Sequence, residues 1–148
     1  MIDLFPRVLS KPITVKEAWN QVVIDNENLK LTSLYIKYWY EAKQGGSLGK
    51  LKATKRLAEN RPAFTMVKSE GNGGLYHPTI PRMLSYTEFK RISSYPDKYT
   101  HIGSRKDWQE RIGNSVPPLF MKAIAIQIRH KIWGGVSLNA LFKNNDLS

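Results

Sequence analysis

The sequence contains no cysteine among its 148 residues. The chain therefore has no disulfide, no thiolate zinc site and no cysteine nucleophile of its own. Histidine is also scarce: His77, His101 and His130 are the only three, and none lies three or four residues from another. Two histidines on one helix face need that spacing to bind a metal together, so the sequence predicts no metal site.

Long hydrophobic runs are missing as well. The longest apolar stretch, residues 119–128, is interrupted by Lys122 and Gln127 and is shorter than the ~18 residues of a membrane span. The first residues lack the basic start and the small-residue cleavage site of a secretory signal. With 41% hydrophobic residues and a mean hydropathy of -0.42, the composition is that of one globular domain, and we expect a cytoplasmic protein with no membrane partner.

Acidic residues are outnumbered, with 12 Asp and Glu against 23 Lys and Arg and a formal net charge of +11. The excess is greatest between residues 43 and 68, where seven basic residues and one acid give +6. Such an excess is typical of proteins that bind a polyanion. It favours a nucleic-acid partner over the alternative, a solvated basic loop.

Two capping boxes predict where helices begin. They are Thr14-Val15-Lys16-Glu17 and Ser85-Tyr86-Thr87-Glu88. In each, the hydroxyl caps a backbone N–H inside the helix and the glutamate reaches back to the cap residue. We expect a helix over residues 15–24 and a two-turn helix that starts at the second box and ends before Pro96.

The remaining pattern is mixed. Paired glycines follow a helix expected over residues 34–43 and a long helix expected over residues 117–133. Residues 47–61 have the glycines and lysines of a basic loop, and residues 63–67 have a strand-like composition. The predicted fold is therefore mixed α/β and mostly helical.

Two ordered motifs occupy the second half of the chain. The first runs from Arg82 to Pro96, with an arginine, a leucine, a serine cap, a glutamate and a tyrosine-proline-aspartate end. The second is Arg111-Ile112-Gly113-Asn114-Ser115-Val116-Pro117-Pro118, and a predicted helix follows it. In this order and at this spacing they closely resemble motifs IX and X at the C-terminal end of the cytosine-5 DNA methyltransferase family. Pro62-Ala63-Phe64-Thr65 is similar to the family's segment before motif IX, so the specific likeness covers roughly residues 61–132.

The resemblance implies how the chain is divided. Residues 1–81 correspond to part of the family's target-recognition region with its basic loop, residues 82–134 to the motif IX and X helices, and residues 135–148 to a tail. The implied fold is the C-terminal portion of such an enzyme. It combines a small recognition domain with the closing helix of the Rossmann-like S-adenosylmethionine domain.

The resemblance also identifies what the chain lacks. The family's Pro-Cys motif supplies the thiolate that attacks cytosine, and a chain without cysteine cannot contain it. Neither the family's Glu-Asn-Val motif nor its Phe-Gly-rich cofactor loop is found. The chain thus looks like the small subunit or C-terminal fragment of a DNA (cytosine-5)-methyltransferase, with no catalytic residue of its own and no activity alone. A second chain would carry the cysteine and share S-adenosyl-L-methionine with it, and DNA as partner implies a nucleoid-associated location.

Two alternatives stay open. The chain is a non-catalytic remnant that binds DNA without a partner, or it is part of a tRNA cytosine-5 methyltransferase, because a tRNA enzyme shares the same motifs. Salt-titrated DNA binding by the chain alone distinguishes the first, and competition between duplex DNA and tRNA distinguishes the second.

The resemblance assigns roles to individual residues. Asn114 and Val116, and more weakly Ser115, correspond to cofactor contacts of motif X. The alternative role for Asn114 and Ser115 is to cap the helix that follows them. The residues that would organise the recognition region are Arg82, Glu88 and Arg91, whose alternative is a helix-surface ion pair three residues apart.

The basic segment supplies the predicted DNA contacts, which are Lys50, Lys52, Lys55, Arg56 and Arg61. Lysines are expected to contact phosphate, whereas arginines are also able to read guanine with two hydrogen bonds. We expect Trp108 and Tyr95 in the hydrophobic core rather than stacked on bases.

Overall fold

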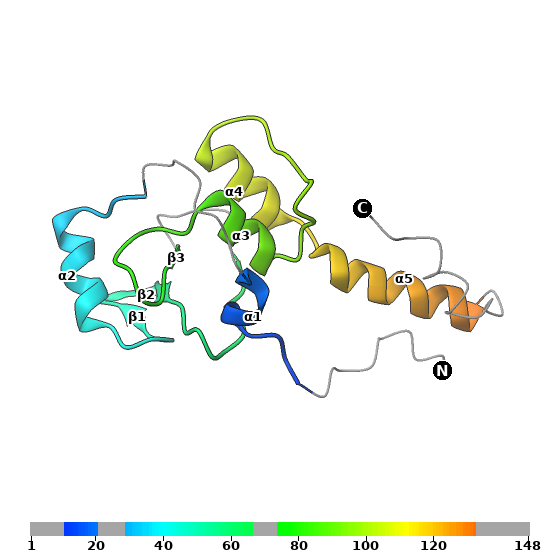
Figure 1. The fold of residues 1–148 in the computed structure, drawn as a ribbon, viewed down its shortest axis with the longest axis horizontal. Helices are drawn as coiled ribbons and strands as arrows, with labels where there is room; N and C mark the ends of the chain where they lie inside the picture. Colours follow the sequence, from blue (N-terminus) through cyan, green and yellow to red (C-terminus); the bar gives the residue numbers. More distant parts are fainter. Residues whose placement is uncertain (1–10, 21–28, 67–73, 133–148) are drawn as a thin grey trace. The chain divides into compact units, whose positions relative to one another are not determined.

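The computed structural model describes residues 11–20, 29–66 and 74–132. Ser10–Pro117 form one compact unit, and α5 belongs to another, so each is described by itself (Figure 1). Mixed α/β architecture, mostly helical, is confirmed for these residues. The elements in chain order are α1 (Val15–Trp19), α2 (Ser33–Glu41), β1 (Ser47–Leu48), β2 (Leu51–Arg56), β3 (Leu75–Tyr76), α3 (Tyr86–Ile92), α4 (Arg105–Asn114) and α5 (Pro118–Ile132).

Capping boxes set the helix starts. The Thr14 and Ser85 boxes are both formed, which confirms the predicted starts of α1 and α3. However, α1 ends at Trp19, before the predicted end at residue 24, and residues 21–24 lie outside the described part of the chain. The starts are sharp because each box satisfies N–H groups that no helical carbonyl reaches.

Helix α4 was not predicted from the sequence. Ser104 caps it, and the third helical residue, Asp107, accepts the backbone N–H of Ser104 at 2.8 Å. The box was overlooked because aspartate stands where glutamate or glutamine is usual. Gly113 and Asn114 are the last two residues of this helix.

Strands were also misplaced. Residues 47–61 were expected to be a loop, yet β1 and β2 form an antiparallel hairpin there, with Ser47 opposite Lys55, and β3 pairs with β2 in parallel. The lysines and glycines obscured a strand pattern whose Leu48 and Thr54 are fully buried. Gly49 makes the tight turn at φ +53°, where a Cβ would lie 2.8 Å from the ring of Tyr38. Conversely, residues 63–66 form no strand, and position 67 lies outside the described residues.

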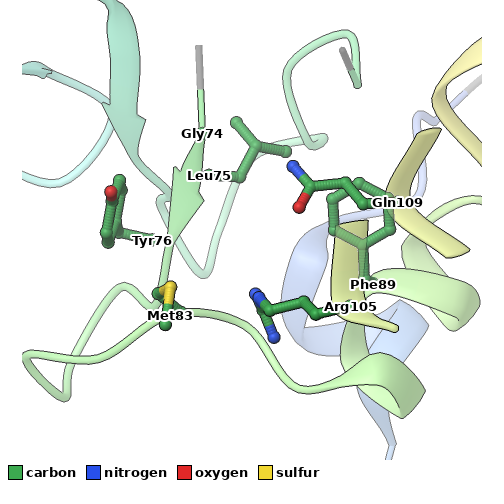
Figure 2. Close-up of a pocket in the computed structure, with 7 residues that line it drawn as sticks. All are labelled: Gly74, Leu75, Tyr76, Met83, Phe89, Arg105 and Gln109. Atoms are coloured by element: carbon green, nitrogen blue, oxygen red, sulfur yellow. The ribbon is translucent and has the colours of Figure 1, made fainter. Parts of the chain in front are cut away.

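Strand β3 joins two hydrophobic clusters. Its two side chains point to opposite faces, as Figure 2 shows, because successive residues of a strand alternate. Leu75 packs with the larger cluster, which includes Phe89 and Trp108, and Tyr76 packs with Trp39 in the smaller one. The expected core position of Trp108 is confirmed, and Tyr95 lies at the edge of the same cluster.

The larger cluster draws from both halves of the Ser10–Pro117 unit. Val15, Leu57 and Leu75 precede residue 82, and Leu84 and Ile112 follow it. The segments before and after residue 82 therefore share one core. This arrangement fixes β2, α3 and the end of α4 relative to one another.

Helix α5 begins and ends within a residue of the prediction. None of its residues is buried, and Leu119, Phe120 and Met121 are about half exposed. No helix among the described residues is long and apolar enough to cross a membrane.

Candidate functional site

A buried ion pair joins Arg82 and Glu88 at the start of α3. Both guanidinium NH groups of Arg82 donate to the two carboxylate oxygens of Glu88, at 2.7 and 2.6 Å, and the side chains are only 11% and 4% exposed. Glu88 also accepts the backbone N–H of Ser85 at 2.8 Å. Burial alone raises the pKa of Glu88, but the hydrogen bonds from Arg82 and Ser85 outweigh it and lower the pKa below its usual range.

His77 completes this buried cluster. Its Nδ1 accepts the backbone N–H groups of Thr79 and Ile80 at 3.2 and 3.1 Å, and its Nε2 lies 3.5 Å from Glu88 Oε1. The ring stacks on Trp19 with centroids 5.1 Å apart. Burial, with the charge of Arg82, lowers the pKa of His77 to about 4, so the imidazole is neutral at pH 7. Its role here is to hold the turn after β3, not to titrate at neutral pH.

Arg91, the third expected organiser, does not pair with Glu88, so the surface-pair alternative is wrong. Its Nε and NH2 donate to the two carboxylate oxygens of Asp97, both at 2.8 Å, and NH1 donates to the carbonyls of Trp19 and Asn20. The hydrogen bond from Arg91 lowers the pKa of Asp97. Arg91 thereby ties the end of α1 to the loop after α3.

The predicted DNA contacts separate into two kinds. Lys50 lies exposed at the hairpin turn, and Arg61 is exposed after β2. The Nζ of Lys55 donates to Ser47 Oγ at 2.7 Å and lies 5.6 Å from the ring centre of Phe64. The side chain of Lys52 lies outside the described part of the structure. Lys50, Lys55 and Arg61 therefore present positive charge on and beside the hairpin.

Arg56 is built into the fold instead. Its Nε donates to Pro78 O at 2.8 Å, and NH1 donates to Trp39 O and Ala42 O at 3.2 and 2.8 Å. The guanidinium lies 3.6 Å from the centre of the Trp39 ring, and burial lowers its pKa. These contacts link β2 to α2 and to the turn after β3, which is a structural task rather than one of reaching a ligand.

The motif X residues lie at the end of α4. Asn114 is exposed, and Val116 is 52% exposed. Ser115 closes α4: its hydroxyl donates to Ile112 O at 2.7 Å and accepts from the Tyr95 hydroxyl at 2.6 Å. Because its hydroxyl proton is committed, Ser115 has less to offer a ligand than Asn114, whose amide both donates and accepts.

Arg105 and Gln109 were not singled out in the sequence. Both extend from α4 toward β3 in Figure 2 and line a cavity of about 10 Å³. Arg105 donates to Leu84 O at 2.9 Å. Gln109 is almost fully buried, and its Oε1 has no hydrogen-bond partner among the described residues. The overlooked α4 capping box was the signal that would have placed both on the inner face of a helix.

No group of three or more histidine, aspartate and glutamate side chains in the described ranges is arranged to hold a metal ion. Two surfaces among the described residues remain as candidate binding sites. One is the basic hairpin, and the other is the end of α4 with Asn114 and Val116.

Comparison with known proteins identifies the family. The sequence profile of C-5 cytosine-specific DNA methylases matches residues 5–130. The chain belongs to this family.

Individual relatives agree with the profile. A Methanocaldococcus jannaschii protein named as a type II methyltransferase is 30% identical over 88% of this chain and 44% of its own length. A type II methyltransferase of Xanthomonas oryzae is 38% identical over 48% of this chain and 15% of its own length. DNA (cytosine-5)-methyltransferase 1 of Gallus gallus is 39% identical over 38% of this chain and 4% of its own length.

A solved Escherichia coli structure, described as a prophage-encoded DNA modification methyltransferase, shares the fold. The TM-score is 0.66 at 17% identity, over 87% of this chain and 50% of that one. The chain spans less than half the length of the curated relatives cited here.

Proposed function

We propose that this chain is the small subunit or C-terminal piece of a DNA (cytosine-5)-methyltransferase, contributing DNA recognition and part of the S-adenosylmethionine site. A second chain, called the large chain below, carries the catalytic cysteine and the rest of the cofactor site. The observation that carries the proposal is the exposure of Asn114 and Val116, which correspond to motif X by resemblance, at the end of α4 in a family member without cysteine.

The absence of cysteine determines which chain supplies the nucleophile. Addition to cytosine needs a soft nucleophile with a usable thiolate fraction, and a serine needs an activating base to replace it. The histidine beside the motif IX cluster, His77, has Nδ1 occupied by two backbone N–H groups and faces Glu88 with Nε2. It is therefore not free to activate a hydroxyl, and the nucleophile is assigned to the large chain.

The residues at the end of α4 suit a zwitterionic cofactor. The Asn114 amide offers both a donor and an acceptor to an amino acid group, and Val116 offers an exposed apolar contact. S-adenosylmethionine supplies the methyl group when bound. This chain's part is to position the cofactor, with Ser115 holding the end of α4 in shape through Tyr95 and Ile112.

DNA contact is assigned to the basic hairpin. Lys50, Lys55 and Arg61 reach phosphate, while Arg56 holds the hairpin against α2. Phosphate contacts fix the register of the protein on the duplex without reading sequence. Lys52 stays in the proposed set because of its place in β2 between Lys50 and Lys55.

The test is reconstitution. We would mix the chain with a candidate large chain, such as the product of an adjacent reading frame, together with duplex DNA and methyl-labelled S-adenosylmethionine. Cytosine methylation by the mixture and by neither chain alone supports the proposal. Absence of methylation in every pairing, with both proteins folded, contradicts it.

Two controls separate the alternatives. Tight DNA binding by this chain alone, unchanged by cofactor and large chain, points to a non-catalytic remnant, and a steep dependence on salt reports the phosphates contacted. Methylation of tRNA in preference to duplex DNA points to the RNA-modifying alternative.

A further inference from the structure

An uncharged cleft of about 410 Å³ lies within the Ser10–Pro117 unit. Its lining comes from residues 62–66, which belong to no helix or strand, and from the ends of α3 and α4, including Ile92 and Ile112. Gly113 and Ser115 lie on its lining, immediately next to Asn114 in sequence. The cleft therefore adjoins the proposed cofactor contacts.

The cleft is uncharged in a strongly basic chain. None of its lining residues is Lys, Arg, Asp or Glu, although such residues make up 24% of the sequence. A cation lies beside the cleft, because the Nζ of Lys55 is 5.6 Å from the ring centre of Phe64, at the side that faces the β1–β2 hairpin. Backbone contacts dominate the affinity of proteins for DNA, and the lining itself supplies no cation for them. The lining therefore favours an uncharged occupant.

Large hydrophobic side chains are left exposed at this place. Ile13 is 53% exposed and Phe64 39%, and both line the cleft. Val116, 52% exposed, follows Ser115 directly. Clustered exposed apolar groups around a concave surface are typical of protein interaction sites, whereas single scattered ones are ordinary.

The length of the relatives indicates the occupant. The chain covers 44% of the Methanocaldococcus jannaschii relative and 50% of the solved neighbour, so those proteins carry about as much chain again. A chain that supplies only part of such a fold leaves uncovered the surface on which the remainder packs. An uncharged cleft beside the cofactor residues has the chemistry and the position for that contact.

We propose that the uncharged cleft formed by residues 62–66 and the ends of α3 and α4 receives uncharged side chains of the large chain. This inference rests on the proposed function and names the surface by which the two chains join. Docking there brings the large chain's part of the cofactor site next to Asn114. It also buries Ile13 and Phe64.

The first experiment measures the affinity between the full-length chain and the purified large chain by calorimetry. Ile13→Glu and Thr65→Glu place a carboxylate in the cleft and are expected to weaken association about 10- to 100-fold, because a charge would be buried on docking. Leu34→Glu is the matched control: Leu34 is 55% exposed and lies on α2, outside the cleft lining. Its affinity should equal that of the unmodified chain, and thermal unfolding of each variant checks that it folds.

The absence of cysteine permits a second, independent measurement. Thr65→Cys introduces a single thiol into the cleft, and Ser33→Cys introduces one at the exposed start of α2. The large chain should slow maleimide labelling of the first thiol at least tenfold and leave the second unchanged, as read by mass spectrometry of this chain.

The outcomes distinguish a wrong docking surface from a wrong proposed function. If the chains associate but neither glutamate variant changes the affinity, the docking surface is wrong and the proposed function survives. Protection of the Thr65→Cys thiol by S-adenosylmethionine alone or duplex DNA alone makes the cleft a ligand site and overturns the inference. If no large chain binds the unmodified protein, the proposed function fails and the docking surface fails with it.

Discussion

Arg82 and Glu88 are joined by two hydrogen bonds, guanidinium to carboxylate, in a buried position where Glu88 also caps the start of α3. One carboxylate thus serves the strand-to-helix connection twice, as a cap and as a counter-ion. The pair fixes the turn after β3 against α3, and α3 is packed against the helix that ends in the motif X residues. The pair therefore contributes to the position of α4 rather than to a site of its own.

Replacing Glu88 should be much more costly than replacing an equivalent exposed residue. Glu88→Gln leaves the charge of Arg82 buried without its counter-ion, and we expect a loss of about 3–5 kcal/mol in the free energy of unfolding. Glu17→Gln alters the same capping-box position in α1, where the side chain is solvent-exposed, and should cost much less. Urea unfolding of both variants makes the comparison, and equal losses would contradict the structural role of the pair.

Acid should destabilise the protein through His77. Its pKa is about 4 in the fold and 6.5 without the fold, so the unfolded chain binds more protons as the pH falls through this range. Stability is fully present above pH 6.5 and is lost progressively toward pH 4, by about 2 kcal/mol at pH 5. Glu88, whose pKa is also lowered, adds to the loss at still lower pH in the same direction.

The matched variants for this pH dependence are His77→Gln and His130→Gln. The first removes the buried imidazole and should flatten the stability profile between pH 7 and pH 5, whatever its effect on stability at pH 7. The second, on exposed residue 130 of α5, should keep the profile of the unmodified chain. A profile that His77→Gln leaves unchanged would remove His77 as its cause.

Arg56 and Lys55 are neighbours on β2 with different predicted effects. Arg56→Ala removes three hydrogen bonds to backbone carbonyls and the contact with Trp39, and should cost about 2–3 kcal/mol of stability. Lys55→Ala should leave stability nearly unchanged, weaken binding to every DNA sequence and lower the salt slope by about one. Thermal unfolding and salt-titrated DNA binding of both variants test the assignment, and the reverse pattern would refute it.

Asn114→Ala tests the cofactor contact. The side chain is exposed at the end of α4, and the loss of a helix cap costs at most about 1 kcal/mol, so the isolated chain should stay folded. In the complex with the large chain, loss of hydrogen bonds to a zwitterionic ligand should weaken S-adenosylmethionine binding about 10- to 100-fold. Calorimetry of cofactor binding to the two complexes gives the answer, and equal affinities would limit the motif to a structural role.

Local signals predicted most of the helices. The Thr14 and Ser85 boxes located α1 and α3 because capping depends on residues three apart in sequence. The start of α4 was not predicted because aspartate replaces the usual glutamate in its capping box, although the shorter side chain of Asp107 still reaches Ser104. The β1–β2 hairpin was not predicted because its burial depends on contacts with α2, such as that of Tyr38 with Gly49. A local sequence pattern does not contain such contacts.

The candidate site was predicted by motif rather than by physics. The likeness to motifs IX and X singled out Arg82, Glu88 and Asn114, and the first two form the buried pair at the start of α3. The charge count could not tell Arg56, held by three carbonyls, from Lys50, which is exposed, because both look alike in sequence. The uncharged cleft could not be predicted from the sequence either, because residues 62–66 and the end of α4 come together only in the folded chain.

The most direct test of the account is a titration of methyl transfer. A fixed amount of large chain with duplex DNA and labelled S-adenosylmethionine is supplemented with increasing amounts of this chain. We predict no cytosine methylation at zero addition, a rise with each addition, and saturation at one chain per large chain. Methylation by the large chain alone that this chain leaves unchanged, or no methylation at any ratio, would contradict the account.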